Sequence, residues 1–214
     1  MAEYKARHLR STSADEASAN EVSQDPEPEP ANDDKKSGGL GVGWVLLTIV
    51  LAFVLAFLLR AFVIGTYVVP SGSMLETIQE GDLLLGQKVT LYFSDPEVGD
   101  IVTFISPEDN ETTLIKRVIA TEGQTIDLID GVVYVDGEAL DEDYTLGKET
   151  YSLSDLTGSV GITYPYTVPE GYIFVMGDNR TNSKDSRYFG AVSVDSVTSI
   201  AVFIYWPPED WGLL

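Results

Sequence analysis

An uncharged apolar segment near the amino terminus constrains the fold of this chain more than any other feature. Residues 40–59 contain twenty positions without a charged side chain, and Val45–Leu59 is interrupted by a polar residue only at Thr48. An α-helix of about 20 residues is about 30 Å long, which matches the hydrocarbon thickness of a bilayer. The segment therefore predicts one membrane-spanning helix, placed at residues 40–60.

A cleaved signal peptide and a buried helix of a soluble protein are the alternative interpretations. The preceding region and the apolar stretch are both longer than a signal peptide requires. Uniform hydrophobicity on all sides of the helix disfavours the second alternative, a buried helix of a soluble protein. Lys35 and Lys36 precede the segment and Arg60 ends it. This small excess of positive charge predicts a cytoplasmic amino terminus, a single pass and an extracytoplasmic body.

Composition differs on the two sides of this segment. Residues 1–39 are rich in Ser, Ala, Glu, Asp and Pro and lack apolar periodicity. Such a sequence is expected to form a disordered, acidic, cytoplasmic tail. A role for the tail in binding a partner is an alternative that no specific motif supports. Residues 61–214 are numerous enough for one core and form the predicted extracytoplasmic domain.

Charge and residue usage exclude several classes of function. The whole chain has a net charge of −21, and residues 61–214 contain seven Lys or Arg against 25 Asp or Glu. A body this negative repels phosphate backbones, so nucleic acid is not an expected partner. The absence of cysteine excludes disulfides, thiolate catalysis and cysteine-type zinc sites. No metal and no cofactor is implied.

The body predicts a mainly β fold. Seven short segments are rich in Val, Ile, Phe and Tyr and are bounded by Gly, Asp and Pro, as strands are. They are Asp82–Leu85, Asp100–Phe104, Leu114–Ala120, Thr125–Ile129, Val132–Val135, Tyr172–Met176 and Ser199–Tyr205. Asp-Gly pairs at 130–131 and 136–137 predict hairpin turns. Residues 138–170 are polar and weakly periodic, and they predict an insertion or flap.

Ser73 and Lys116 are the candidate catalytic pair. The only histidine, His8, lies in the predicted tail, so a nucleophilic serine would need another base, and an uncharged lysine is one alternative. Gly72 permits a tight bend beside Ser73, where a short helical turn over residues 73–78 would present free N–H groups to a carbonyl oxygen. A turn capped by serine is the structural alternative.

Lys116 lies in a predicted strand, where alternation directs Lys116 and Arg117 to opposite faces. We therefore expect one of the two to be buried and the other to reach solvent or an acid. A lysine with a pKa near 10.4 is only about 0.4% neutral at pH 8, and burial can remove this cost by lowering the pKa. An ion-paired lysine at a sheet edge is the alternative.

Four segments in this order, after a membrane helix, resemble bacterial type I signal peptidase, the Ser/Lys endopeptidase that removes signal peptides from exported proteins. They are Pro70–Met74, Gly99–Phe104, Ile115–Ile119 and Gly177–Gly190. The resemblance extends from about Arg60 to Trp206. It implies a signal-peptidase-like β-barrel or sheet domain in the bacterial cell membrane, with the bilayer and the signal peptides of exported preproteins as partners.

The resemblance also assigns roles to individual residues. It implies that Ser73 is the nucleophile, that Lys116 is the general base, and that the Ser71 hydroxyl joins the Ser73 amide in the oxyanion hole. It implies that Ser183 hydrogen-bonds and orients the amine of Lys116. Asp185 and Arg187 are expected to pair and support that loop.

Substrate specificity is implied less directly. The positions that match small apolar pockets for Ala-x-Ala sites are Val69, Met74, Ile78 and Ile115. An extended substrate would lie beside Tyr67–Val69 or Leu114–Lys116. The chain departs from the family pattern at Glu76, where proline is frequent, which leaves the shape beside the pocket open.

A chain with these features has three alternatives to a signal peptidase of this type. Self-cleaving SOS-response repressors share the Ser/Lys fold but lack a membrane helix. Eukaryotic and archaeal-type signal peptidases use a histidine at the position of Lys116. A catalytically silent, membrane-tethered β-domain that binds exported proteins is the alternative from another functional class.

Overall fold

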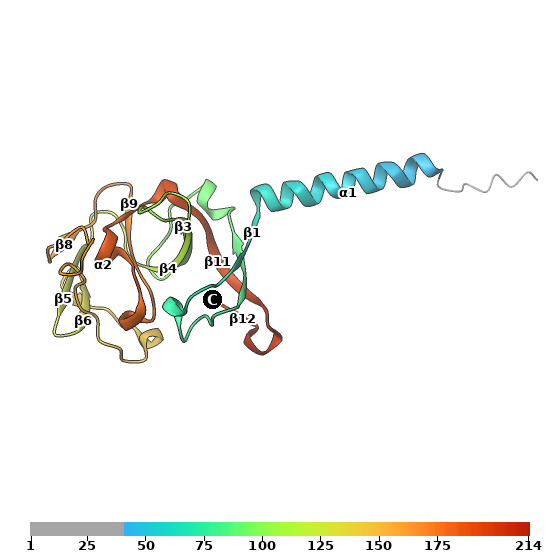
Figure 1. Ribbon diagram of the computed structural model, residues 1–214. Coiled ribbons are helices and arrows are strands. Elements are labelled where there is room, and N and C mark those ends of the chain that lie inside the picture. Colours follow the sequence, from blue (N-terminus) through green and yellow to red (C-terminus); the bar gives the residue numbers. More distant parts are fainter. Residues whose placement is uncertain (1–40) are drawn as a thin grey trace, which may run out of the picture. The chain divides into compact units, whose positions relative to one another are not determined.

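One long helix precedes a β-rich body in the structure, a computed structural model that describes residues 41–214 (Figure 1). Helix α1 (Val42–Phe62) has no buried residue and is long and apolar enough to cross a membrane. The predicted mainly β fold after one apolar helix is confirmed. The predicted tail, residues 1–39, lies outside the described residues.

Short strands make up most of the remaining regular structure. A second helix is α2 (Ser186–Phe189). The strands are β1 (Ile64–Val68), β2 (Leu83–Gln87), β3 (Ile101–Ile105), β4 (Thr113–Ala120), β5 (Thr125–Ile129), β6 (Val132–Val135), β7 (Glu138–Ala139), β8 (Tyr166–Thr167), β9 (Tyr172–Met176), β10 (Val192–Ser193), β11 (Val197–Trp206) and β12 (Gly212–Leu213). All seven predicted strands are confirmed to within a few residues at each end. The seven segments did not include β1, of which only the end was expected to be extended, at Tyr67–Val69, and they did not include the two-residue strands.

The strands form two antiparallel sheets. The larger has the order β1-β2-β11-β3-β4-β9-β10, with β12 paired to β11, and the smaller has the order β7-β6-β5-β8. In Figure 1, β5, β6 and β8 are grouped away from the larger sheet. Within residues 41–214, β1 and β10 end the larger sheet without pairing with each other, so the sheet is not closed into a barrel.

Both predicted hairpin turns are present in the smaller sheet. Asp130 and Gly131 have φ angles of 51° and 82° between β5 and β6, and Ile129 pairs with Val132 across the turn. Asp136 and Gly137 have φ angles of 55° and 84° between β6 and β7. Positive φ at both central positions is the geometry that Asp-Gly accommodates in a two-residue turn.

Three apolar clusters form the core. The first joins β3, β4 and β9 with α2, and another lies between the smaller sheet and β9. The cluster that supports the site described below consists of Val69, Met74, Ile78, Leu84, Ile101, Ala201 and Ile204. Strand β1 and the turn after it are packed onto this cluster, so the segment that follows β1 has a fixed support.

Residues 138–170 contain little regular structure. They comprise β7, a 3₁₀ turn at Asp143–Thr145, β8 and irregular connections. Several of their side chains nevertheless contact the loop 177–190, as described below. Their assignment as an insertion or flap stays a prediction.

Candidate active site

Ser73 lies on a tight turn that follows β1. The predicted helical turn over 73–78 is a three-residue 3₁₀ turn, η1 (Gly72–Met74), entered by an extended Ser71. A Cβ atom at Gly72 would lie 2.8 Å from a side-chain carbon of Leu75 and 2.9 Å from Oε1 of Glu80. A larger residue at this position would therefore have to displace the ends of these two side chains. Ser73 itself is 7% exposed.

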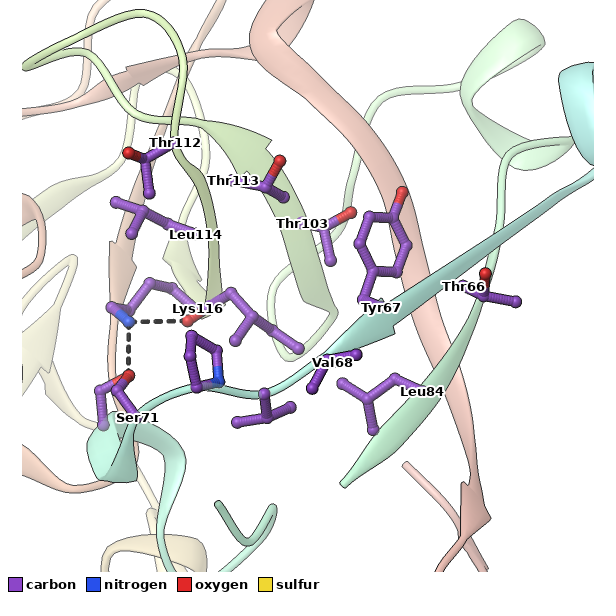
Figure 2. A pocket seen from close by; sticks show the side chains of 14 residues that line it. Thr66, Tyr67, Val68, Ser71, Leu84, Thr103, Thr112, Thr113, Leu114 and Lys116 are labelled. Atoms are coloured by element: carbon purple, nitrogen blue, oxygen red, sulfur yellow. Dashed lines mark hydrogen bonds between the residues drawn. The ribbon is translucent and has the colours of Figure 1, made fainter. Parts of the chain in front are cut away.

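Lys116 reaches Ser73 from a strand that is separated from β1 by β2, β11 and β3 in the larger sheet. It lies on β4, is 3% exposed, and its Nζ atom donates hydrogen bonds to Ser73 Oγ and to Ile115 O, each 2.7 Å long (Figure 2). Burial lowers the pKa of Lys116 to about 8, against the opposing charges of Asp185 and Asp178. The two residues selected from the sequence as nucleophile and base are thus in contact.

Arg117 points to the opposite face of β4, as strand alternation predicts. Its Nε donates to Asp178 Oδ1 at 2.9 Å and its Nη2 donates to Asp178 Oδ2 at 2.7 Å. Thr77 also donates to Oδ2 of Asp178, which is fully buried. This bidentate pair fixes the start of the loop 177–190 against β4.

Asn179 holds the turn that carries Ser73, a position that the sequence analysis missed. Its main-chain N–H donates to Ser73 O at 3.1 Å, and its Nδ2 donates to Gly72 O at 2.8 Å. Asn179 is 7% exposed. Its neighbours in the loop 177–190 are equally polar in sequence, so no local signal shows that this side chain turns inward.

Asp185 and Arg187 form a buried ion pair at the far end of the same loop. Arg187 donates from Nε to Oδ1 of Asp185 at 2.9 Å and from Nη2 to Oδ2 at 2.8 Å. Asp185 also accepts a 3.0 Å bond from the N–H of Gly177. Burial alone would raise the pKa of Asp185, but the Arg187 guanidinium outweighs it and holds that pKa below its usual value.

Ser183 lies close to Ser73 but forms no hydrogen bond with Ser73 or Lys116. The positions of Ser183 Oγ and Ser73 O both crowd the space that a Cβ atom of Gly177 would need. Among the described residues, Ser183 Oγ is buried and has no hydrogen-bond partner. The orienting contact with Lys116 expected from the resemblance is not formed in this structure, and the role of Ser183 stays a prediction.

A cavity of about 290 Å³ opens beside Ser73 and Lys116. Two segments provide most of its wall, Thr66–Ser71 with β1 and Thr112–Lys116 with β4 (Figure 2). The predicted pocket residues Val69 and Ile115 are among the lining residues. Met74 and Ile78 are not, and both lie fully buried in the core cluster beneath.

Tyr67, Val68 and Leu114 also line the cavity, and they belong to the two segments beside which an extended substrate was expected to lie. The lining residues that were not expected from the sequence are Thr66, Leu84, Thr103, Thr112 and Thr113. Ser71, the expected second oxyanion donor, also lines the cavity and is exposed to it. Among residues 41–214, no group of three or more His, Cys, Asp or Glu side chains is arranged to hold a metal ion.

This geometry is competent for serine-type hydrolysis. A hydroxyl bonded to a buried amine can lose its proton to that amine when the amine is neutral. With a pKa of about 8, roughly one tenth of Lys116 is neutral at pH 7, far more than for an ordinary lysine. The cavity provides space for an acyl substrate directly beside the hydroxyl.

Comparison with known proteins places this arrangement in a family. Residues 42–206 match the family described as "Signal peptidase, peptidase S26", and the chain belongs to this family. It is 41% identical over 173 residues to Probable signal peptidase I-1 of Synechocystis sp. (strain ATCC 27184 / PCC 6803 / Kazusa), covering 78% of this chain and 83% of the relative. The expected resemblance and the expected enzyme class, a serine endopeptidase, are confirmed.

Two further relatives come from other lineages. Signal peptidase I T of Bacillus subtilis (strain 168) is 37% identical over 163 residues, which cover 74% of this chain and 82% of the relative. Thylakoidal processing peptidase 1, chloroplastic, of Arabidopsis thaliana is 33% identical over 198 residues, covering 83% of this chain and 55% of that longer protein. Family membership and α1 together fit a membrane-anchored enzyme.

Proposed function

We propose that this chain cleaves signal peptides from exported preproteins with Ser73 as nucleophile and Lys116 as general base. The observation that carries the proposal is the 2.7 Å hydrogen bond from Lys116 Nζ to Ser73 Oγ at the wall of a cavity. The enzyme is anchored in a bacterial cell membrane by α1, in a single pass. Its amino terminus is cytoplasmic and its catalytic body is extracytoplasmic.

Cleavage takes place through an acyl-enzyme. The neutral amine of Lys116 accepts the proton of Ser73 as Oγ attacks the carbonyl carbon before the cut. The resulting ammonium gives this proton to the departing amine, the C–N bond breaks, and an ester on Ser73 remains. Water then attacks the ester carbon and gives a proton to Lys116; the bond from this carbon to Ser73 Oγ breaks, Lys116 returns the proton to Oγ, and the carboxylic acid product leaves.

The oxyanion of each tetrahedral intermediate is bound by the Ser73 N–H and the Ser71 hydroxyl. Ser71 is extended and lines the cavity next to Ser73, which is compatible with this role. Donors fixed in advance at this position stabilise charge that develops only in the transition state.

The substrate lies extended between β1 and the first half of β4. Strand β1 ends the larger sheet, and the pairing of β4 with β9 begins only at Arg117. The edge of β1 and residues 113–116 of β4 thus face the cavity with main-chain groups available to an added strand. The side chains of Val69 and Ile115 line the cavity, and their role in this proposal is to favour small residues such as those of Ala-x-Ala sites.

A cleavage assay tests this proposal. The detergent-solubilised full chain is incubated with a labelled preprotein that carries an Ala-x-Ala site, and the new amino terminus is sequenced. We expect cleavage by the native chain and none by Ser73→Ala or Lys116→Met, with unchanged circular dichroism in all three. Cleavage retained in either variant would contradict the assigned roles. A native chain that binds the preprotein without cutting it would support the silent, tethered β-domain instead.

A further inference from the structure

Asn179 binds two consecutive main-chain carbonyl groups, those of Gly72 and Ser73. Nδ2 of Asn179 donates to Gly72 O and the Asn179 N–H donates to Ser73 O. A trans peptide is planar, so the Gly72 carbonyl and the Ser73 N–H point in opposite directions. Fixing Gly72 O from one side therefore fixes the direction of the Ser73 N–H on the other side.

The side-chain amide of Asn179 can perform this task in only one orientation. If the amide were rotated by 180°, its oxygen would face the Gly72 oxygen and the contact would become repulsive. Lys148 is the main group that selects the correct orientation, because its Nζ donates to Asn179 Oδ1 at 3.0 Å, whereas the other donor to this oxygen, Thr181 Oγ1, lies 3.5 Å away. The ammonium group of Lys148 can only donate hydrogen bonds, so its partner must be the oxygen of the amide and not the nitrogen.

Lys148 is itself held in place by the segment that surrounds it. Glu142 forms a bidentate pair with Arg180, the residue after Asn179, with distances of 2.9 Å and 2.6 Å. Thr150 accepts a 2.9 Å bond from Nη1 of the same Arg180. Glu142 and Thr150, which precede and follow Lys148 in sequence, are thus both bonded to Arg180, and this gives Lys148 a defined place beside Asn179.

We propose that Lys148 is a positioning residue for catalysis. Through Asn179 and Gly72 O, its ammonium keeps the Ser73 N–H directed at the oxyanion. Lys148 does not touch the reacting atoms and does not line the cavity. The inference rests on the proposed function of Ser73, and it gives part of the irregular segment 138–170 a role in the rate of the reaction.

Kinetics of a Lys148 series test the inference. Lys148→Met keeps the length of the side chain and removes its charge, and a misdirected oxyanion donor is expected to lower kcat by about tenfold while KM stays within about twofold. Lys148→Arg restores a cationic donor and recovers most of the loss. Lys184→Met is the matched control, because it removes one charge from an exposed side chain of the loop 177–190, and its kcat is expected to stay within about twofold of native.

A double variant distinguishes positioning from a general loss of structure. Asn179→Ala removes the link, so adding Lys148→Met to it should lower kcat no further. The inference is overturned if Lys148→Met leaves kcat unchanged, if its effect multiplies in full with that of Asn179→Ala, or if only KM and thermal stability change.

Hydrogen exchange provides a readout that does not depend on cleavage. The Asn179 N–H is protected by Ser73 O, so a peptide covering residues 177–182 should exchange faster in Lys148→Met and as slowly as native in Lys148→Arg. If the native chain cuts no preprotein but the two Lys148 variants show this exchange pattern, the proposed function is refuted and the link from Lys148 to Ser73 is preserved. Unchanged exchange in Lys148→Met would refute the link itself.

Discussion

The Nζ atom of Lys116 lies 2.7 Å from the Oγ atom of Ser73, and neither residue is more than 7% exposed. The two residues come from β4 and from the turn after β1, so only the folded chain brings them together. The same burial that excludes water from the amine also lowers its pKa. Stability and reactivity at this site are therefore linked, and the pH dependence of both can be derived.

The cleavage rate should rise with pH and level off near pH 8. Burial lowers the pKa of Lys116 to about 8, and only the neutral amine can accept the Ser73 proton. Below this value kcat/KM is expected to fall by about tenfold per pH unit. Measurement of kcat/KM on one preprotein between pH 6 and 10 checks this. A midpoint near 10.4, the ordinary value for lysine, would show that the amine is not perturbed.

Lys116→Met should abolish cleavage and stabilise the fold at pH 7. A decrease from 10.5 to about 8 in the pKa of a buried lysine corresponds to a cost of about 3 kcal/mol when the unfolded chain is protonated. The native chain bears this cost in full below pH 8 and loses it as pH rises toward 10.5, because between these values the unfolded state binds more protons. The free energy of unfolding is measured by urea denaturation at pH 7 and at pH 10. It should be clearly higher for Lys116→Met than for the native chain only at pH 7.

Asp185→Asn should move the midpoint of the pH–rate profile to a lower pH. The charge of Asp185 raises the pKa of Lys116 against the effect of burial, so its removal lets that pKa fall further. The variant leaves Arg187 buried without its partner and is expected to lose about 3–5 kcal/mol of stability. The profile is therefore measured in the cold.

Two further variants control this experiment. Asp178→Asn removes the other carboxylate that raises the pKa of Lys116 and should shift the midpoint in the same direction. Asp155→Asn changes an exposed acid outside the site and should leave the midpoint unchanged. A midpoint that rises in either Asp185→Asn or Asp178→Asn would contradict the electrostatic account.

Gly177→Ala should impair both folding and cleavage. A Cβ atom at this position would collide with the side chain of Ser183 and with the main-chain oxygen of Ser73. The backbone of the turn must then shift, at a cost of roughly 1–3 kcal/mol and of a large part of the activity. Thermal unfolding and the cleavage assay measure the two effects.

Gly212→Ala is the matched control for this substitution. The nearest atom to its Cβ would be Asp210 O at 3.8 Å, an ordinary contact distance. Activity should therefore remain within about twofold of native. Equal loss of activity in both variants would show that the crowding at Gly177 is not the cause.

The positions of most strands could be predicted from the sequence, but the pairing of the strands within the sheets could not. Segments such as Leu114–Ala120 are rich in β-branched residues and end at turn residues, which are local properties. The pairing of β2 with β11 joins parts of the chain that are far apart, and alternation shows only which face is buried. Only the end of β1, at Tyr67–Val69, was expected to be a strand, because its first residues follow the apolar helix closely and include Gly65.

The candidate pair Ser73 and Lys116 could be proposed from the sequence because its chemistry is restrictive and because the family resemblance favours a base over an ion-paired lysine at position 116. Without cysteine and with its only histidine outside the body, the chain has few possible bases, and alternation correctly separated Lys116 from Arg117. The assignment of Met74 and Ile78 to the cavity could not be checked from sequence, since an apolar side chain after a turn packs equally well into a core. Asn179 carries no local signal, because its role depends on the position of Gly72.

The short connection between the anchor and the nucleophile limits where this enzyme can act. Only eleven peptide steps separate Phe62, the end of α1, from Ser73. At about 3.3–3.6 Å per residue, the hydroxyl can never be more than roughly 40 Å from the end of the membrane anchor. The connection between Phe62 and Ser73 therefore limits the distance at which the enzyme can act as well as joining it to the anchor. A peptide bond that lies beyond this radius is not cleaved, whatever the sequence around it.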